Sequence, residues 1–142
     1  MHEALARANF EQDVAALSDA AASRLGLVVH SRTFPIFDVT IEHKPAVRLR
    51  FHGEDFDERP PGIDILKPDG SNWAGPMPPG GVFNGGPHSV KGGPFICMRG
   101  SREYHTHSSH VNDNWANYRK QEGMGIVGIL LQLNGVWRKG FP

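Results

Sequence analysis

Cys97 is the only cysteine of the sequence, and residues able to transfer protons or bind metals follow it closely. These residues are Glu103, His105, His107 and His110, all within thirteen positions of the cysteine. A thiol becomes a competent nucleophile as the thiolate, which a nearby imidazolium or backbone dipole favours. The pattern therefore predicts chemistry on Cys97, of either a nucleophilic or a metal-binding kind.

In the nucleophilic interpretation, Cys97 accepts an acyl group as a thioester, and a neighbouring side chain handles the proton of the incoming nucleophile. We expect His105 or His107 to help deprotonate the acceptor, and Glu103 to orient that imidazole. In an extended segment these three residues lie on one face, because side chains alternate with a period of two. The predicted catalytic set is therefore Cys97, Glu103, His105 and His107.

The same four residues also allow a metal site, because Cys97, Glu103, His105 and His107 supply one sulfur, one oxygen and two nitrogen donors. Such a donor set could bind zinc. The two roles compete, since a thiolate that closes a metal site is not free to attack a carbonyl. A lone cysteine is also often just a small buried apolar residue. Of these interpretations we favour the nucleophile, which needs no metal and no cofactor.

Residues 67–94 must position the cysteine, and they hold half of the glycine and proline of the chain. No helix or central strand tolerates this composition. A coil of this length inside a domain usually serves a function, and it leads directly to Cys97. Trp73 either anchors this coil by packing or contacts a partner. His88 and His110 are more simply explained as structural or surface residues.

The remaining chain predicts an α+β fold. Residues 3–25 show an apolar face at the helical period, and residues 126–137 show a second one. Between them lie short segments rich in β-branched and aromatic residues, which predict four strands of an antiparallel meander. These strands are expected at residues 27–29, 34–41, 46–51 and 63–66.

The composition excludes some classes of partner. The 142 residues include 15 basic and 15 acidic ones, so the formal net charge is zero with neutral histidines. Binders of nucleic acid or membrane surfaces normally carry a basic excess, so we expect neither partner. No apolar run approaches the ~20 residues of a membrane helix, and the N-terminus shows no secretory signal. We expect a cytoplasmic location, where a lone thiol stays reduced.

The order of these features resembles that of the ubiquitin-conjugating (E2-like, UBC-fold) enzymes across nearly the whole chain. That family places an aromatic-acidic turn with a Pro-Pro pair before the fourth strand, and residues 56–61 match it. A His-Pro-Asn motif then precedes an Ile-Cys active site. Here residues 87–89 read Pro-His-Ser, with proline and histidine exchanged, before Ile96 and Cys97. Trp115 matches the tryptophan that follows the cysteine.

The resemblance implies one UBC-like domain over residues 1–142, with Cys97 carrying a ubiquitin-like protein as a thioester. An E1-like activating enzyme would load the cysteine, and a target protein would receive the modifier, in a bacterial ubiquitin-like pathway. The series Cys97, Glu103, His105, His107 also resembles a small bacterial family of the same setting, described as a predicted metal-binding domain. A catalytically inactive UBC-like binding module is the third alternative.

Overall fold

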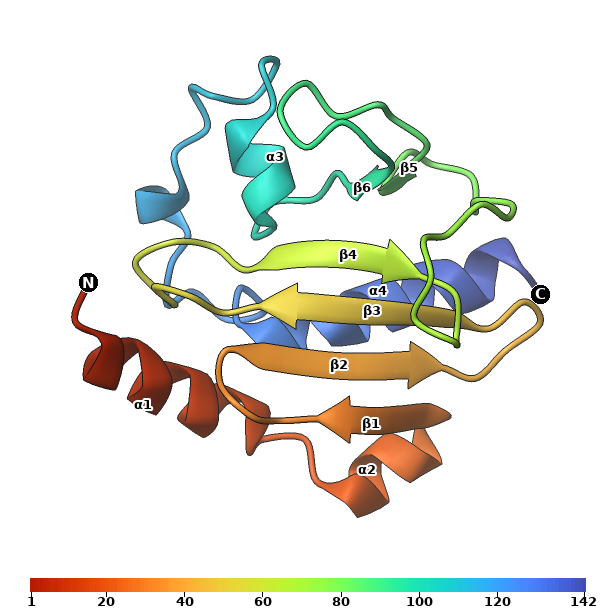
Figure 1. The fold of residues 1–142 in the computed structure, drawn as a ribbon, viewed down its shortest axis with the longest axis horizontal. Coiled ribbons are helices and arrows are strands. Elements are labelled where there is room, and N and C mark those ends of the chain that lie inside the picture. The colour runs from red at the N-terminus through yellow and green to blue at the C-terminus, as the bar shows by residue number, and fades with distance from the viewer.

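Four antiparallel strands form the central sheet of the computed structural model, which describes all residues from 1 to 142 (Figure 1). They follow one another across the sheet in the order β1-β2-β3-β4. Their bounds are Leu27–Ser31 (β1), Ile36–Ile41 (β2), Val47–His52 (β3) and Gly62–Leu66 (β4). The predicted strands and their antiparallel meander are therefore confirmed. Buried and partly exposed residues alternate along β3, so one face of this strand lies in the core. Val47, Leu49 and Phe51 are fully buried, and the residues between them are partly exposed.

The predicted single helix over residues 3–25 is wrong, because the structure divides it into α1 (Glu3–Val14) and α2 (Asp19–Arg24). Ser18 starts the second helix, and its hydroxyl accepts a hydrogen bond from the Ala21 amide. A serine at this position satisfies a backbone donor that a new helix leaves free. Leu17 in the connection is itself buried, so the apolar periodicity continues through the break and conceals it.

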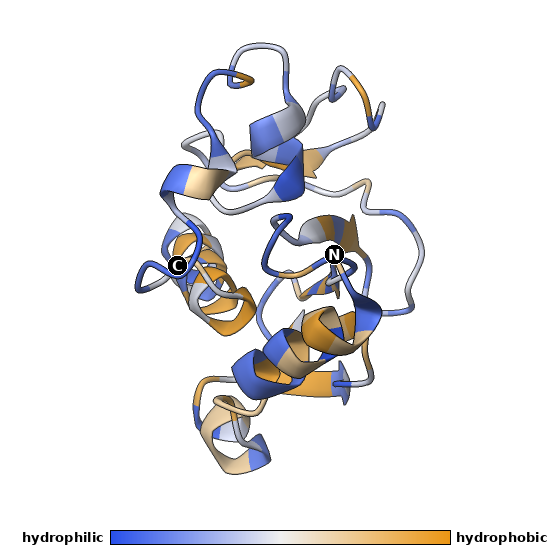
Figure 2. Ribbon diagram, turned by 90° about the vertical axis from the view of Figure 1, so that its left-hand side faces the viewer, coloured by the Kyte–Doolittle hydropathy of each residue, from blue (hydrophilic) through white to orange (hydrophobic).

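Helix α4 (Ile126–Gly140) confirms the predicted C-terminal helix and lies behind the sheet in Figure 1. Its apolar side joins the core of the sheet through Ile126, Ile129, Leu130, Leu133 and Trp137. Apolar residues gather on α4, α1 and the strands, whereas the loops around α3 are mostly hydrophilic or neutral (Figure 2). No helix is long and apolar enough to cross a membrane.

The Gly/Pro-rich residues 67–94 contain one short strand, β5 (Phe83–Asn84), which pairs with β6 (Phe95–Ile96). Trp73 is buried, and its ring meets that of Trp137 edge to face at 5.3 Å between centroids. Trp73 therefore anchors this segment by packing. After β6 come α3 (Arg102–Thr106) and a 3-10 turn (Trp115–Asn117).

Candidate functional site

Cys97 lies directly after β6, where the chain leaves the short two-stranded sheet. Its amide donates a hydrogen bond to the Val82 carbonyl at 2.7 Å, which attaches the cysteine to the middle of the Gly/Pro-rich segment. The side chain is half-buried, and this burial raises the pKa of the Cys97 thiol. The sulfur is therefore a neutral thiol at neutral pH, and it needs a proton acceptor to become a nucleophile.

His110 is the imidazole in contact with this thiol. Its Nε2 lies 3.9 Å from Cys97 Sγ, within the range of a hydrogen bond to sulfur. The ring of His110 stacks on the ring of Tyr104 in α3, with 4.2 Å between centroids and 14° between planes. The structure thus pairs Cys97 with the histidine that the sequence assigned to a structural or surface role.

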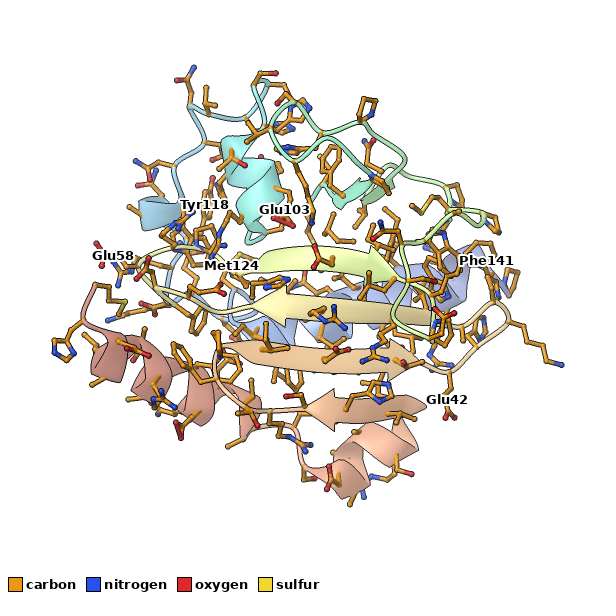
Figure 3. All side chains as sticks on the ribbon, in the orientation of Figure 1. Glu42, Glu58, Glu103, Tyr118, Met124 and Phe141 are labelled. Carbon is orange, nitrogen blue, oxygen red and sulfur yellow. The ribbon has the colours of Figure 1, made fainter.

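Asp113 connects the residues around this pair. Its carboxylate accepts hydrogen bonds from the Tyr104 hydroxyl at 2.5 Å, from Arg99 Nε at 2.8 Å and from the Tyr118 hydroxyl. These donors hold the pKa of the Asp113 carboxyl well below its usual range. The backbone carbonyl of Asp113 accepts a fourth hydrogen bond, from His105. Tyr118 is labelled beside α3 in Figure 3.

The expected extended conformation of residues 103–107 is not observed, because most of this stretch forms α3. Ser101 caps the helix, and its hydroxyl accepts a hydrogen bond from the Tyr104 amide. Successive helical residues are about 100° apart, so Glu103 and His105 leave the helix in nearly opposite directions. The predicted common face of Glu103, His105 and His107 is therefore wrong.

Glu103 faces the central sheet (Figure 3). Its Oε1 accepts a hydrogen bond from the Ile63 amide of β4 at 2.6 Å, and Lys91 Nζ lies 3.6 Å away. Burial raises the pKa of the Glu103 carboxyl. The carboxylate attaches α3 to the sheet, and no hydrogen bond joins it to a histidine ring, as an orienting role would require.

Both ring nitrogens of His105 serve the local fold. Nδ1 donates to the Asp113 carbonyl at 2.7 Å, and Nε2 accepts from the Gly100 amide at 3.1 Å. This arrangement requires a neutral imidazole with its proton on Nδ1, and burial also lowers the pKa of His105. The ring of His107 stacks on Phe95, and its Nδ1 accepts from the Ser109 amide.

No group of three or more His, Cys, Asp or Glu side chains is arranged to hold a metal ion. The four donors of the predicted zinc set, Cys97, Glu103, His105 and His107, are not assembled around one point. Two of them, Glu103 and His105, are already committed to backbone hydrogen bonds. The arrangement offers acid–base chemistry by one thiol and one imidazole.

His88 has a structural role in the loop before the cysteine. It is buried, and its Nδ1 accepts hydrogen bonds from the amides of Val90 and Lys91 at 3.0 and 2.9 Å. Its Nε2 donates to the Glu103 carbonyl at 2.7 Å. These bonds organise residues 88–91 and attach them to α3, so the structural role expected for His88 is confirmed.

Cys97 lies outside the cavities of the protein. The largest, of about 410 Å³, is lined by residues of α1, of the turn at 56–57 and of the segment 120–125. A second one, of about 310 Å³, lies between β4, Lys91 and α3. None of the five is lined by Cys97. Small substrates are usually enclosed in pockets, and the thiol of Cys97 is not.

The structure thus defines an α+β protein with a half-exposed thiol beside one imidazole. Residues 86–141 match the sequence model of the Y4jH-like family, described as the Y4jH family. The matched stretch contains Cys97, Tyr104, His110 and Asp113, and also α4. No curated protein matches the chain.

Sequence reasoning missed Tyr104, His110 and Asp113 as parts of the site. No periodicity relates them, since Tyr104 lies in α3 and the other two lie in the turns that follow it. The available signal was compositional: one tyrosine, three histidines and one aspartate occur within the sixteen residues that follow Cys97. Such a signal shows which residues are present, but not which rings meet.

Proposed function

We propose that this protein is an E2-like conjugating enzyme that carries a ubiquitin-like protein as a thioester on Cys97. The observation that carries the proposal is the thiol itself, half-exposed, outside every cavity and 3.9 Å from His110 Nε2. The element order adds support: a helical N-terminus, a four-stranded meander, a Gly/Pro-rich segment, the cysteine and a final helix. This order is the one that the resemblance to UBC-like enzymes implies.

The proposed reaction is an exchange of thioesters. Cys97 Sγ attacks the carbonyl carbon of a modifier held as a thioester on an E1-like activating enzyme, and His110 Nε2 takes the thiol proton. The bond to the donor sulfur breaks, and that sulfur leaves as a thiolate, which is then protonated. In the second step an amine of the target protein attacks the new thioester and forms an amide bond. The bond to Cys97 Sγ breaks, and the leaving thiolate takes up the proton that the amine loses.

The partners proposed for this reaction are all proteins: the activating enzyme, the ubiquitin-like modifier and the target. The open position of Cys97 gives a folded donor access to the sulfur. The zero formal net charge provides no basic excess for nucleic acid or anionic lipid. We propose the cytoplasm as the compartment, where a lone thiol stays reduced.

The experiment incubates the protein with ATP and with the E1-like and ubiquitin-like proteins encoded by the same genome. We expect an adduct on a non-reducing gel, larger by the mass of the modifier and lost on addition of a thiol reductant. Cys97→Ala should abolish the adduct. Cys97→Ser should trap the modifier as an oxygen ester that survives the reductant.

Two outcomes would contradict the proposal. One is the absence of any adduct with a loaded activating enzyme when the protein is folded, and the other is an adduct that persists in Cys97→Ala. Ser108→Ala is the matched control, since it removes one hydroxyl from an exposed residue of the turns that carry His110.

A catalytically inactive UBC-like binding module is the second candidate. Burial favours it, because the raised pKa keeps the Cys97 thiol protonated and slow to react. In that case the modifier would bind wild type and Cys97→Ala with equal affinity, and neither protein would form an adduct.

A further inference from the structure

We propose that Tyr104 is a positioning residue that holds the His110 imidazole against Cys97 and is itself held by Asp113. The inference rests on the proposed function in one respect, namely that Cys97 is the reacting group. Tyr104 does not touch the sulfur, so its effect passes through His110.

His110 differs from the other histidines of this region in what fixes its ring. His88, His105 and His107 each use ring nitrogens in hydrogen bonds to backbone or hydroxyl groups. The ring of His110 has no hydrogen bond other than the contact of Nε2 with the Cys97 sulfur. Its orientation therefore depends on packing, and the parallel stack on Tyr104 is its closest ring contact.

The Tyr104 ring is fixed at both ends. Its backbone belongs to α3, whose first turn is capped by Ser101. Its hydroxyl donates to the Asp113 carboxylate at 2.5 Å, and Arg99 binds the same carboxylate at 2.8 Å. A ring held in this way presents one face to His110, and the backbone of Asp113 closes the turn that carries His110.

The stack also suits the charge that the reaction creates. When His110 takes the thiol proton it becomes a cation, and the face of an aromatic ring attracts cations. The titratable rings against His110 are Tyr104 and His107, and Asp113, Arg99 and His105 lie behind Tyr104 in the same hydrogen-bonded cluster. Arg99 and Asp113 neutralise each other in an ion pair. The Tyr104 face is therefore the partner available to an imidazolium at this position.

The test measures alkylation of Cys97 by iodoacetamide, which needs no partner protein. We expect Tyr104→Leu and His110→Gln each to slow the reaction about tenfold, the effect of losing one interaction with a charged group. In the double variant the two losses should not add, because Tyr104 acts through His110. Tyr104→Phe keeps the stacking face and loses only the hydrogen bond to Asp113, so its rate should fall by no more than about threefold.

The non-additive loss and the rescue by phenylalanine are results that a general loosening of the fold would not produce. An alkylation rate in Tyr104→Leu equal to that of wild type would overturn the proposal. Additive losses in the double variant, or a full loss in Tyr104→Phe, would overturn it as well. The outcome is separate from the proposed function, because Cys97 can show this pattern even if no modifier is ever transferred to it.

Discussion

At the residue scale, what each histidine bonds to decides its role. His105 uses both ring nitrogens to join Gly100 and Asp113, and His107 packs against Phe95. Only His110 has an imidazole nitrogen in contact with the thiol. A proton acceptor must lie within hydrogen-bond reach of the proton it takes. Geometry therefore selects His110, although His105 and His107 lie closer to Cys97 in the sequence.

The first prediction concerns His110→Gln. The glutamine side chain is a far weaker base than imidazole, so we expect the single-turnover rate of thioester transfer to Cys97 to fall about 100-fold. The measurement is a quenched time course on non-reducing gels with preloaded activating enzyme.

The variant Glu103→Gln distinguishes His110 as the base from the base predicted from the sequence, which is His105 or His107 oriented by Glu103. The amide oxygen can still accept from the Ile63 amide, and no hydrogen bond joins the Glu103 side chain to a histidine ring. We therefore expect the transfer rate to stay within about twofold of wild type, as a residue outside the reacting groups should behave. A loss as large as that of His110→Gln would restore Glu103 as the residue that orients the base.

At the element scale, one ion pair and one hydrogen bond of Lys91 attach the loop before the cysteine to the sheet. Lys91 Nζ lies 2.8 Å from Asp64 Oδ1 and donates to the Ile63 carbonyl at 2.7 Å. His52 of β3 lies 2.7 Å from the other oxygen of Asp64. His52 and Lys91 hold the pKa of the Asp64 carboxyl well below its usual range, and Asp64 raises the pKa of His52.

The second prediction is the pH dependence of this cluster. The Asp64 contribution to stability is present above the ordinary carboxyl pKa of about 4 and is lost as the pH falls through the lower folded value. The His52 contribution is present below the ordinary imidazole pKa of about 6.5 and is lost as the pH rises through the raised folded value. Asp64→Asn should therefore cost most stability between about pH 5 and 6.5.

Urea denaturation of wild type and Asp64→Asn across this pH range measures the difference. We expect the gap to shrink on both sides of the window, and to shrink less on the alkaline side, where Lys91 stays charged. A gap that does not change with pH would mean that these contacts contribute nothing through ionisation.

A side chain of α1 also caps the start of α4, the other long helix. Asp13, near the end of α1, accepts hydrogen bonds from the Ile126 and Val127 amides at 2.9 and 3.0 Å, at the start of α4. Gly125 supplies no side chain of its own to cap α4. A carboxylate from α1 therefore satisfies donors that the helix terminus leaves free.

The third prediction follows from this cap. Asp13→Ala should lower the free energy of unfolding by about 1–2 kcal/mol, the usual effect of removing a capping side chain. Glu11→Ala is the matched control, since it removes an exposed carboxylate of the same helix and should change stability by less than about 0.5 kcal/mol. Equal losses in the two variants would show that the cap makes no particular contribution.

At the scale of the whole molecule, one aromatic cluster holds the Gly/Pro-rich segment on the core. Trp73 and Phe83, near its start and its middle, both meet the ring of Trp137 in α4, at 5.3 and 4.9 Å between centroids. The segment has little secondary structure of its own, so side-chain packing must hold its course. The position of Cys97 depends on that course, since its amide binds the Val82 carbonyl.

The fourth prediction is that Trp73→Ala loosens this segment. We expect a loss of about 3 kcal/mol in the free energy of unfolding, as for other large aromatic residues removed from cores. Limited proteolysis should then cut between residues 67 and 94 before other sites. Trp73→Phe keeps an aromatic ring and should lose less than half as much; a protease pattern unchanged in Trp73→Ala would contradict the anchoring role.

The amino-acid sequence alone predicts the sheet and the final helix, and both are observed. Alternating apolar residues indicate a strand, and an apolar face at the helical period indicates a helix. Both patterns are local, so they predict the element without knowledge of what it packs against. The break before Ser18 was missed because apolar residues continue on the same side through Leu17. Local patterns therefore predict what is buried better than where a helix ends.

Which side chains face the thiol follows from the three-dimensional packing alone. The helix α3 turns Glu103 to the Ile63 amide and His105 to Gly100, and it leaves the Tyr104 ring to pack on His110. These contacts depend on Ser101, on β4 and on the turn closed by Asp113. No regular spacing in the sequence relates any of them to Cys97. A site built from short turns is set by long-range hydrogen bonds and ring packing, and such interactions have no signature in the local order of residues.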